Sequence, residues 1–162
     1  MKNSKARFIS HSAVIAALYV VLTILANLFG LSSGAIQVRF SEALTILPIF
    51  TVAAIPGLFV GCIIANILAG SMFLDVVFGS LATLIGAYFT YLLRKRPVLA
   101  TLPPILSNTL IIPFVLRFVY AIDGSLPYFI LTVGIGEIIS CGILGTILAR
   151  YIRKNNRIFK NI

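Results

Sequence analysis

The sequence contains only four acidic residues, and a carboxyl group in a hydrophobic protein is well suited to bind a cation or carry a proton. Glu137 lies deep within an apolar segment, where a carboxyl group costs about 2.5–3.5 kcal/mol on membrane-insertion scales. This cost predicts a partner or a ligand for Glu137. Glu42 and Asp75 lie near the ends of other apolar segments, whereas Asp123 belongs to an Asp-Gly-Ser turn typical of a solvated loop.

Two amide side chains also interrupt apolar segments. Asn66 and Asn108 occur at depths comparable with that of Glu137. Acids and amides at such depths predict a polar cavity that opens toward the outside of the membrane and binds a ligand.

Each of these residues also has a purely structural interpretation. Arg39 and Glu42 are three residues apart and can pair along one helix face. Asn66 and Asn108 can join helices through hydrogen bonds that contribute about 0.6 kcal/mol on average. Asp75 can stabilise the positive end of a helix. These alternatives remain open at the level of the sequence.

Several other chemistries lack the residues that they need. The sequence has no G-x-x-x-x-G-K-[ST] motif for ATP, and no Ser with a plausible general base. His11 is the single histidine, and no cluster has metal-ligand spacing. Cys62 and Cys141 lie inside apolar segments and are interpreted as small buried hydrophobes. We therefore expect neither an enzyme, nor a cofactor, nor a metal site.

The elements that position these residues are predicted to be transmembrane helices. Hydrophobic residues make up 60% of the 162 residues and charged residues 10%, with a mean hydropathy of +1.10. About 20 apolar residues are needed for each helical crossing. The sequence predicts an all-α integral membrane protein, with one transmembrane domain over residues 1–162 and six helices. The predicted spans are residues 8–29, 39–50, 56–69, 73–93, 104–120 and 127–150.

The basic residues predict the orientation of these spans. With six spans, one side of the membrane receives eleven of the thirteen Lys and Arg residues: Lys2, Lys5, Arg7, Arg94, Lys95, Arg96, Arg150, Arg153, Lys154, Arg157 and Lys160. The other side receives Arg39 and Arg117. The positive-inside rule then places both termini in the cytoplasm of a multi-pass plasma-membrane protein. The net charge of +9 is explained by this topology, with some attraction to anionic lipids, and requires no nucleic acid.

A face of small residues occurs on the first predicted span. Ala13 and Ala17 are four residues apart, a spacing that permits close approach of another helix. From spacing alone, packing within this bundle is preferred over docking of a partner.

Three segments carry a resemblance to a known family. QVRFSEALTILPIF (37–50), IPGLFVG (55–61) and LDVVFGSLATLIGAY (74–88) are similar to the QueT family. The resemblance implies an S component, the substrate-binding subunit of an energy-coupling factor (ECF) transporter, which takes up a queuosine precursor. It also implies a substrate site near the outer face, a transmembrane coupling protein and two ATPase subunits as partners. An A-x-x-x-A motif contacts the coupling protein in this class, so the resemblance favours docking for Ala13 and Ala17.

The implied substrate suits the acids and amides. A precursor such as 7-aminomethyl-7-deazaguanine carries the N1–H and exocyclic amine donors of guanine, together with an ammonium group. We expect one carboxylate, Glu137, to accept from the guanine-like edge and Glu42 to meet the ammonium. An amide of Asn108 or Gln37 is suited to the O6 side. The predicted substrate-binding residues are Glu137, Glu42, Asn108, Asn66, Asp75, Gln37 and Arg39.

Two alternatives remain open. The first is a self-sufficient proton- or cation-coupled carrier in which Glu137 is the protonatable group. The second is an S component for a different vitamin.

Overall fold

The computed structural model describes residues 2–31 and 36–155, and all regular secondary structure within these residues is helical. The prediction of an all-α protein is therefore confirmed. Residues 32–35, between the first two predicted spans, and Arg157 and Lys160, near the C-terminus, lie outside the described residues.

Ten helical elements follow one another in the described residues. They are α1 (Lys2–Leu28), η1 (Phe40–Ile49), α2 (Ala54–Leu68), α3 (Phe73–Leu92), η2 (Leu99–Thr101), α4 (Leu102–Phe114), η3 (Val115–Val119), α5 (Leu126–Glu137), η4 (Ile138–Leu144) and α6 (Gly145–Lys154). The elements η1 and η2 are 3₁₀ helices, and η3 and η4 are π-helical turns.

Four helices in the described residues are long and apolar enough to cross a membrane. They cover Ser4–Leu28, Phe73–Leu92, Leu99–Val119 and Leu126–Lys154, with hydropathies between 1.6 and 2.2. Their outward faces carry large apolar side chains, as at Phe73 and Leu28, which are 78% and 76% exposed. Such a surface requires lipid as its solvent. These helices correspond to four of the six predicted spans.

The remaining two predicted spans are shorter helices. The segment predicted as a span over residues 39–50 forms η1, whose ten residues extend about 20 Å at the rise of a 3₁₀ helix. The fifteen residues of α2 extend about 22 Å. Both lengths fall short of the roughly 30 Å of a hydrocarbon core. Pro48 explains part of the difference in η1, because it lacks the N–H group that an α-helix needs at that position.

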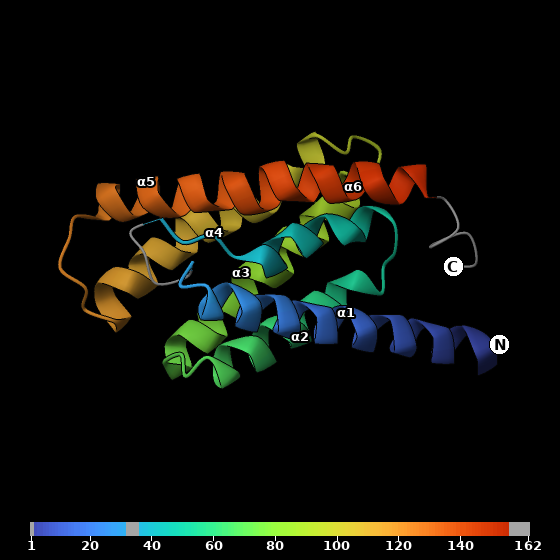
Figure 1. Ribbon diagram of the computed structural model, residues 1–162, viewed down its shortest axis with the longest axis horizontal. Helices are drawn as coiled ribbons and strands as arrows, with labels where there is room; N and C mark the ends of the chain where they lie inside the picture. The colour runs from blue at the N-terminus through green and yellow to red at the C-terminus, as the bar shows by residue number, and fades with distance from the viewer. Residues whose placement is uncertain (1, 32–35, 156–162) are drawn as a thin grey trace.

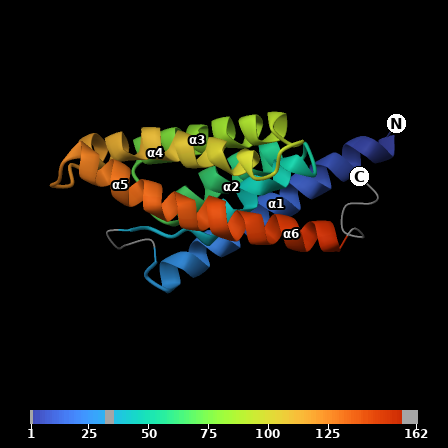
Figure 2. The ribbon, with the colours of Figure 1, turned by 90° about the horizontal axis from the view of Figure 1, so that it is seen from above.

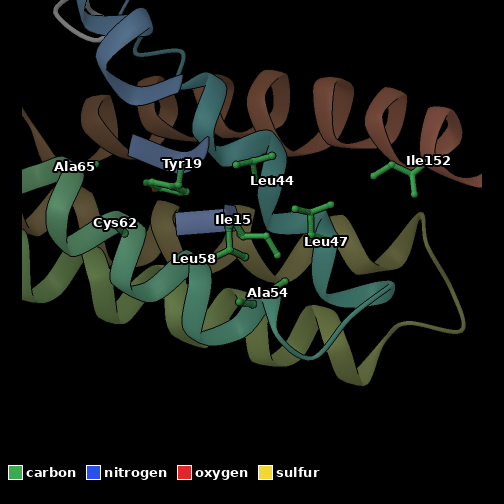
Figure 3. Close-up of a cluster of buried hydrophobic side chains, with 10 residues drawn as sticks. Ile15, Tyr19, Leu44, Leu47, Ala54, Leu58, Cys62, Ala65 and Ile152 are labelled. Carbon is green, nitrogen blue, oxygen red and sulfur yellow. The ribbon is translucent and has the colours of Figure 1, made fainter. Parts of the chain in front are cut away.

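The helix η1 lies inside the bundle and forms the centre of its core. It packs against α1, α2, α3, α6 and η4. Figure 3 shows Leu44 and Leu47 of η1 beside Ile15 and Tyr19 of α1 and Leu58 of α2. Burial inside the bundle explains the apolar composition of this short helix.

The helices α1 and α2 approach each other closely through small residues. A methyl group at Gly57 would lie 2.7 Å from the Ser12 carbonyl oxygen, and one at Gly61 would lie 3.0 Å from the Cα atom of Ala16. The Ser12 hydroxyl donates to the Ala53 carbonyl at 2.9 Å. The α1 face that packs on α2 therefore includes Ser12, Ile15, Ala16 and Tyr19.

The molecule has two distinct ends. The N-terminal end of α1 and the C-terminal end of α6 lie at one end, which we call the terminal end (Figures 1 and 2). The α2–α3 and α4–α5 connections lie at the opposite end, which we call the cavity end (Figure 1).

Candidate functional site

A cavity of about 420 Å³ lies at the cavity end, between α1, the α2–α3 turn and the α4–α5 connection. Its volume falls within the range of about 300–1,000 Å³ that is typical of small-molecule sites. Polar side chains predominate in its wall. The lining residues are Thr23, Asn27, Gln37, Arg39, Asn66, Ala69, Ser71, Asp75, Leu116, Tyr120 and Ile122.

Asp75 supplies the carboxylate of the cavity wall. It lies in the first turn of α3, where the positive end of the helix favours an acidic side chain, and it is only 6% exposed. Its Oδ2 atom accepts a hydrogen bond from the Tyr120 hydroxyl at 2.8 Å. Asp75 therefore lies where it can stabilise the positive end of α3, and it also lines the cavity.

Asn66 and Asp75 converge above Gly79 of α3. A methyl group at Gly79 would lie 3.2 Å from Nδ2 of Asn66 and 3.5 Å from Oδ1 of Asp75. The absence of a side chain at Gly79 therefore leaves space beside an amide group and a carboxylate oxygen. The same amide nitrogen donates weakly to Sγ of Cys62 at 3.5 Å.

Gln37 and Arg39 reach the cavity from the extended segment that precedes η1. The backbone N–H of Arg39 donates to Oγ of Ser140 at 3.1 Å. The carbonyl oxygen of Gln37 packs so closely on Gly136 that any side chain at position 136 would collide with it. These contacts fix the segment against α5 and η4, with both side chains half-buried.

Glu42, Glu137 and Asn108 form a separate buried cluster. Glu42 is 2% exposed and Glu137 is 8% exposed. Glu42 accepts hydrogen bonds from the Tyr19 hydroxyl and, at 3.5 Å, from Nδ2 of Asn108. Cys141 donates to Oε2 of Glu137 at 3.1 Å. Ligand atoms of Glu42, Glu137 and Cys141 lie within 4.8 Å of one another.

This cluster has the residue types of a cation site and also forms a buried hydrogen-bond network. Two carboxylates and a thiol are potential metal ligands. Both carboxylate oxygens of Glu42 already accept hydrogen bonds, from Tyr19 and Asn108. Each of these oxygens retains a further lone pair, so the buried hydrogen-bond network still has acceptor capacity for a proton or a cation.

The structure thus divides the seven predicted residues into two groups. Four line the cavity: Gln37, Arg39, Asn66 and Asp75. The other three, Glu42, Asn108 and Glu137, belong to the buried cluster.

One turn of α1 connects the cluster to the cavity. Tyr19 donates to Glu42, and the Thr23 hydroxyl binds the Tyr19 carbonyl at 2.9 Å and Oγ of Ser41 at 2.9 Å. Thr23 itself lines the cavity. The cluster is therefore linked to the cavity wall through the hydrogen bonds of Tyr19 and Thr23.

Sequence reasoning did not identify Tyr19, Thr23 or Tyr120. Tyrosines are common at membrane interfaces, so neither tyrosine is conspicuous in the sequence. The sequence predicts that Cys141 is a small buried hydrophobe, and it is indeed buried, but its thiol also donates to Glu137. A signal existed for that contact, because residues four apart on a helix share a face.

Ala13 and Ala17 lie on an exposed face of α1. They flank Ala16, which is buried against Gly61 of α2. The two alanines therefore lie beside the packed face rather than within it.

Comparison with known proteins identifies the family of this chain. The sequence profile described as QueT transporter matches residues 9–154. The chain belongs to the QueT transporter family. A QueT relative, the "Queuosine precursor transporter QueT" of Lactococcus lactis subsp. cremoris (strain MG1363), is 41% identical over 96 residues. That region covers 59% of this chain and 56% of the relative, little more than half of its length. No solved structure matches the chain.

Proposed function

We propose that this protein is the substrate-binding S component of an ECF transporter and captures a queuosine precursor of the 7-deazaguanine type from outside the cell. Membership of the QueT family and the name of the relative support the substrate class. The observation that carries the proposal is the polar cavity with Asp75 and Asn66 on its wall, at the end opposite the termini.

The lining residues have the chemistry to bind such a ligand. 7-Aminomethyl-7-deazaguanine has several donors and a positive charge, which suit the Asp75 carboxylate. Asn66 and Gln37 offer both donors and acceptors, and Arg39 donates to the carbonyl O6 side. The cavity also presents Leu116 and Ile122 to the flat face of the rings. Glu42, Glu137 and Asn108 do not line the cavity. They support its wall by holding α1 and η1 in place.

Energy would come from partner chains. We propose that the terminal end faces the cytoplasm, as the distribution of basic residues predicts. The exposed Ala13 and Ala17 would then present a surface of small side chains to the coupling protein, which two ATPase subunits drive. The cavity end would face outward and receive the ligand.

One observation favours a second candidate function. The buried carboxylates of Glu42 and Glu137 approach within 4.8 Å of each other. Two such groups repel strongly when both are ionised, so a proton or cation is expected to bind between them. A self-sufficient carrier coupled to protons or cations would use such a site.

Reconstitution separates the two functions. The protein is placed in liposomes, either alone or with a coupling protein and ATPases from an ECF transporter, and uptake of radiolabelled 7-aminomethyl-7-deazaguanine is measured. We expect uptake only with the partners and ATP. Uptake by the protein alone, driven by a proton or sodium gradient, would contradict the S-component assignment and support the carrier.

A further inference from the structure

Tyr120 lies in a tightly constrained connection at the mouth of the cavity. It follows the π-helical turn η3, and its backbone N–H donates to the Val115 carbonyl at 3.1 Å. The next residue, Ala121, has a φ of 50°, which is uncommon for a residue with a side chain. Backbone strain of this kind persists where the surrounding contacts determine the conformation.

The Tyr120 hydroxyl makes two hydrogen bonds to the start of α3 and the residue before it. It accepts from the backbone N–H of Met72 at 3.2 Å and donates to Oδ2 of Asp75 at 2.8 Å. Partial burial and the bond to Asp75 raise the pKa of Tyr120 above its ordinary value. The hydroxyl is therefore protonated at neutral pH and remains a donor.

These bonds orient the two oxygens of Asp75 differently. Oδ2 accepts from the Tyr120 hydroxyl, whereas Oδ1 lies beside Gly79, as does Nδ2 of Asn66. A carboxylate whose rotation is fixed in this way presents one chosen oxygen to a ligand at a lower entropic cost than a freely rotating group.

We propose that Tyr120 is a positioning residue for ligand recognition, which holds the Asp75 carboxylate so that Oδ1 accepts from an N–H group of a flat heterocycle while the Asn66 amide N–H donates to a neighbouring carbonyl oxygen. This inference rests on the proposed function, because it concerns the same cavity. The ring of Tyr120 adds an aromatic wall beside the ligand.

The test is a double-mutant cycle on binding. Dissociation constants for 7-aminomethyl-7-deazaguanine are measured by calorimetry for the wild type, Tyr120→Phe, Asp75→Asn and the double variant. Tyr120→Phe keeps the ring and removes the hydroxyl, so we expect affinity to fall about tenfold. If Tyr120 acts through Asp75, adding Tyr120→Phe to Asp75→Asn should cost nothing further.

Tyr128→Phe is the matched control, because Tyr128 is exposed at the same end of the molecule and is not part of the cavity lining. Its affinity should equal that of the wild type. The inference, but not the proposed function, would be overturned if Tyr120→Phe bound the probe with wild-type affinity. The same would follow if the losses of binding free energy in the two single variants added in the double variant. Failure of the wild type to bind the probe would instead overturn the proposed function and the inference with it.

A second measurement applies if Tyr120→Phe does not fold. Incorporation of 3-fluorotyrosine at position 120 preserves the shape and the hydroxyl of the side chain. Its ¹⁹F resonance should shift when 7-aminomethyl-7-deazaguanine is added to the folded protein. An unchanged resonance at saturating probe would overturn the positioning role.

Discussion

The two buried glutamates differ in the hydrogen bonds that they accept. Glu42 accepts from Tyr19 and Asn108, whereas Glu137 accepts from Cys141. Glu42→Gln places an amide N–H against one of the two donors, which costs about 1–3 kcal/mol for a buried group. Glu137→Gln retains an acceptor for Cys141 and preserves the shape of the side chain.

We therefore expect Glu42→Gln to lower the thermal unfolding temperature in detergent clearly more than Glu137→Gln does. The measurement is thermal unfolding of both variants under one set of conditions, with circular dichroism as the readout. Equal destabilisation would contradict the assignment of Glu42 as the centre of the network.

At the residue scale, the depth of Glu137 predicted a partner, and the structure provides one in Cys141. The sequence did not reveal that this partner is a thiol in the same helix, because a cysteine in an apolar segment has the pattern of a core residue. The role of Tyr120 at the cavity was not predicted for another reason. Its role depends on a contact with Asp75, 45 positions away in the chain.

At the scale of elements, Gly79 of α3 has no side chain and so leaves space between Asn66 of α2 and Asp75 of α3. Gly79→Ala removes a flexible residue from a helix, which favours folding by up to about 1 kcal/mol. Its methyl group would lie 3.2 Å from the Asn66 amide and press on the groups that are proposed to bind the ligand. We expect an unchanged or higher unfolding temperature together with an affinity reduced about tenfold.

Gly134→Ala is the control for this effect. It lies in the helix α5, and its added methyl group would meet only Thr109, at an ordinary distance of 3.5 Å. It should retain wild-type affinity for 7-aminomethyl-7-deazaguanine. Loss of affinity in both glycine variants would mean that helix rigidity, rather than space at Gly79, controls binding.

The alanines of α1 allow docking and internal packing to be separated. Ala13 and Ala17 are exposed, while Ala16 is buried against Gly61 of α2. Replacing Ala13 and Ala17 together by Leu should abolish uptake in the reconstituted transporter, yet leave the affinity and the unfolding temperature of the isolated protein near those of the wild type.

Ala16→Leu should behave in the opposite way. Its larger side chain would force α1 away from α2 and lower the unfolding temperature, because overpacking typically costs about 1–3 kcal/mol. If the Ala13/Ala17 variant unfolds as readily as Ala16→Leu, the exposed face is needed for folding and the docking proposal is wrong.

Hydropathy predicted the long helices well because their length and apolar composition are properties of local sequence. The helices Phe73–Leu92 and Leu126–Lys154, for example, begin and end within a few residues of the predicted spans 73–93 and 127–150. Hydropathy alone was not sufficient for residues 39–50, because a buried 3₁₀ helix and a membrane span are equally apolar. Only the packing of η1 inside the bundle distinguishes them.

At the scale of the whole molecule, the position of the cavity depends on the orientation in the membrane. Val98 follows α3 and is 71% exposed, and Ser125 lies in the exposed α4–α5 connection. A cysteine at Ser125 should react with a membrane-impermeant maleimide in intact cells, whereas one at Val98 should react only after lysis. Cys62 and Cys141 are buried and should give little background. The reverse labelling pattern would place the cavity end in the cytoplasm.

The separation of the two ends was partly predictable. Most basic residues occur in the segments predicted for the side of the termini, whereas the acids occur elsewhere. This distribution predicted a polar cavity away from the termini. The sequence did not show that Asp75 and Asn66 lie on the cavity wall while Glu42 and Glu137 lie beneath it. That division arises from the position of η1 in the core, which is a long-range property of the fold.

The most direct test of the central claim is the dissociation constant of 7-aminomethyl-7-deazaguanine, measured by calorimetry on the purified protein. The wild type and Asp123→Asn, which alters an exposed acid outside the cavity, should bind equally well. Asp75→Asn should bind at least about 30-fold more weakly, because it removes a buried charge from a charge-assisted contact. No binding by the wild type, or equal binding by all three proteins, would contradict the assignment of this cavity as the queuosine-precursor site.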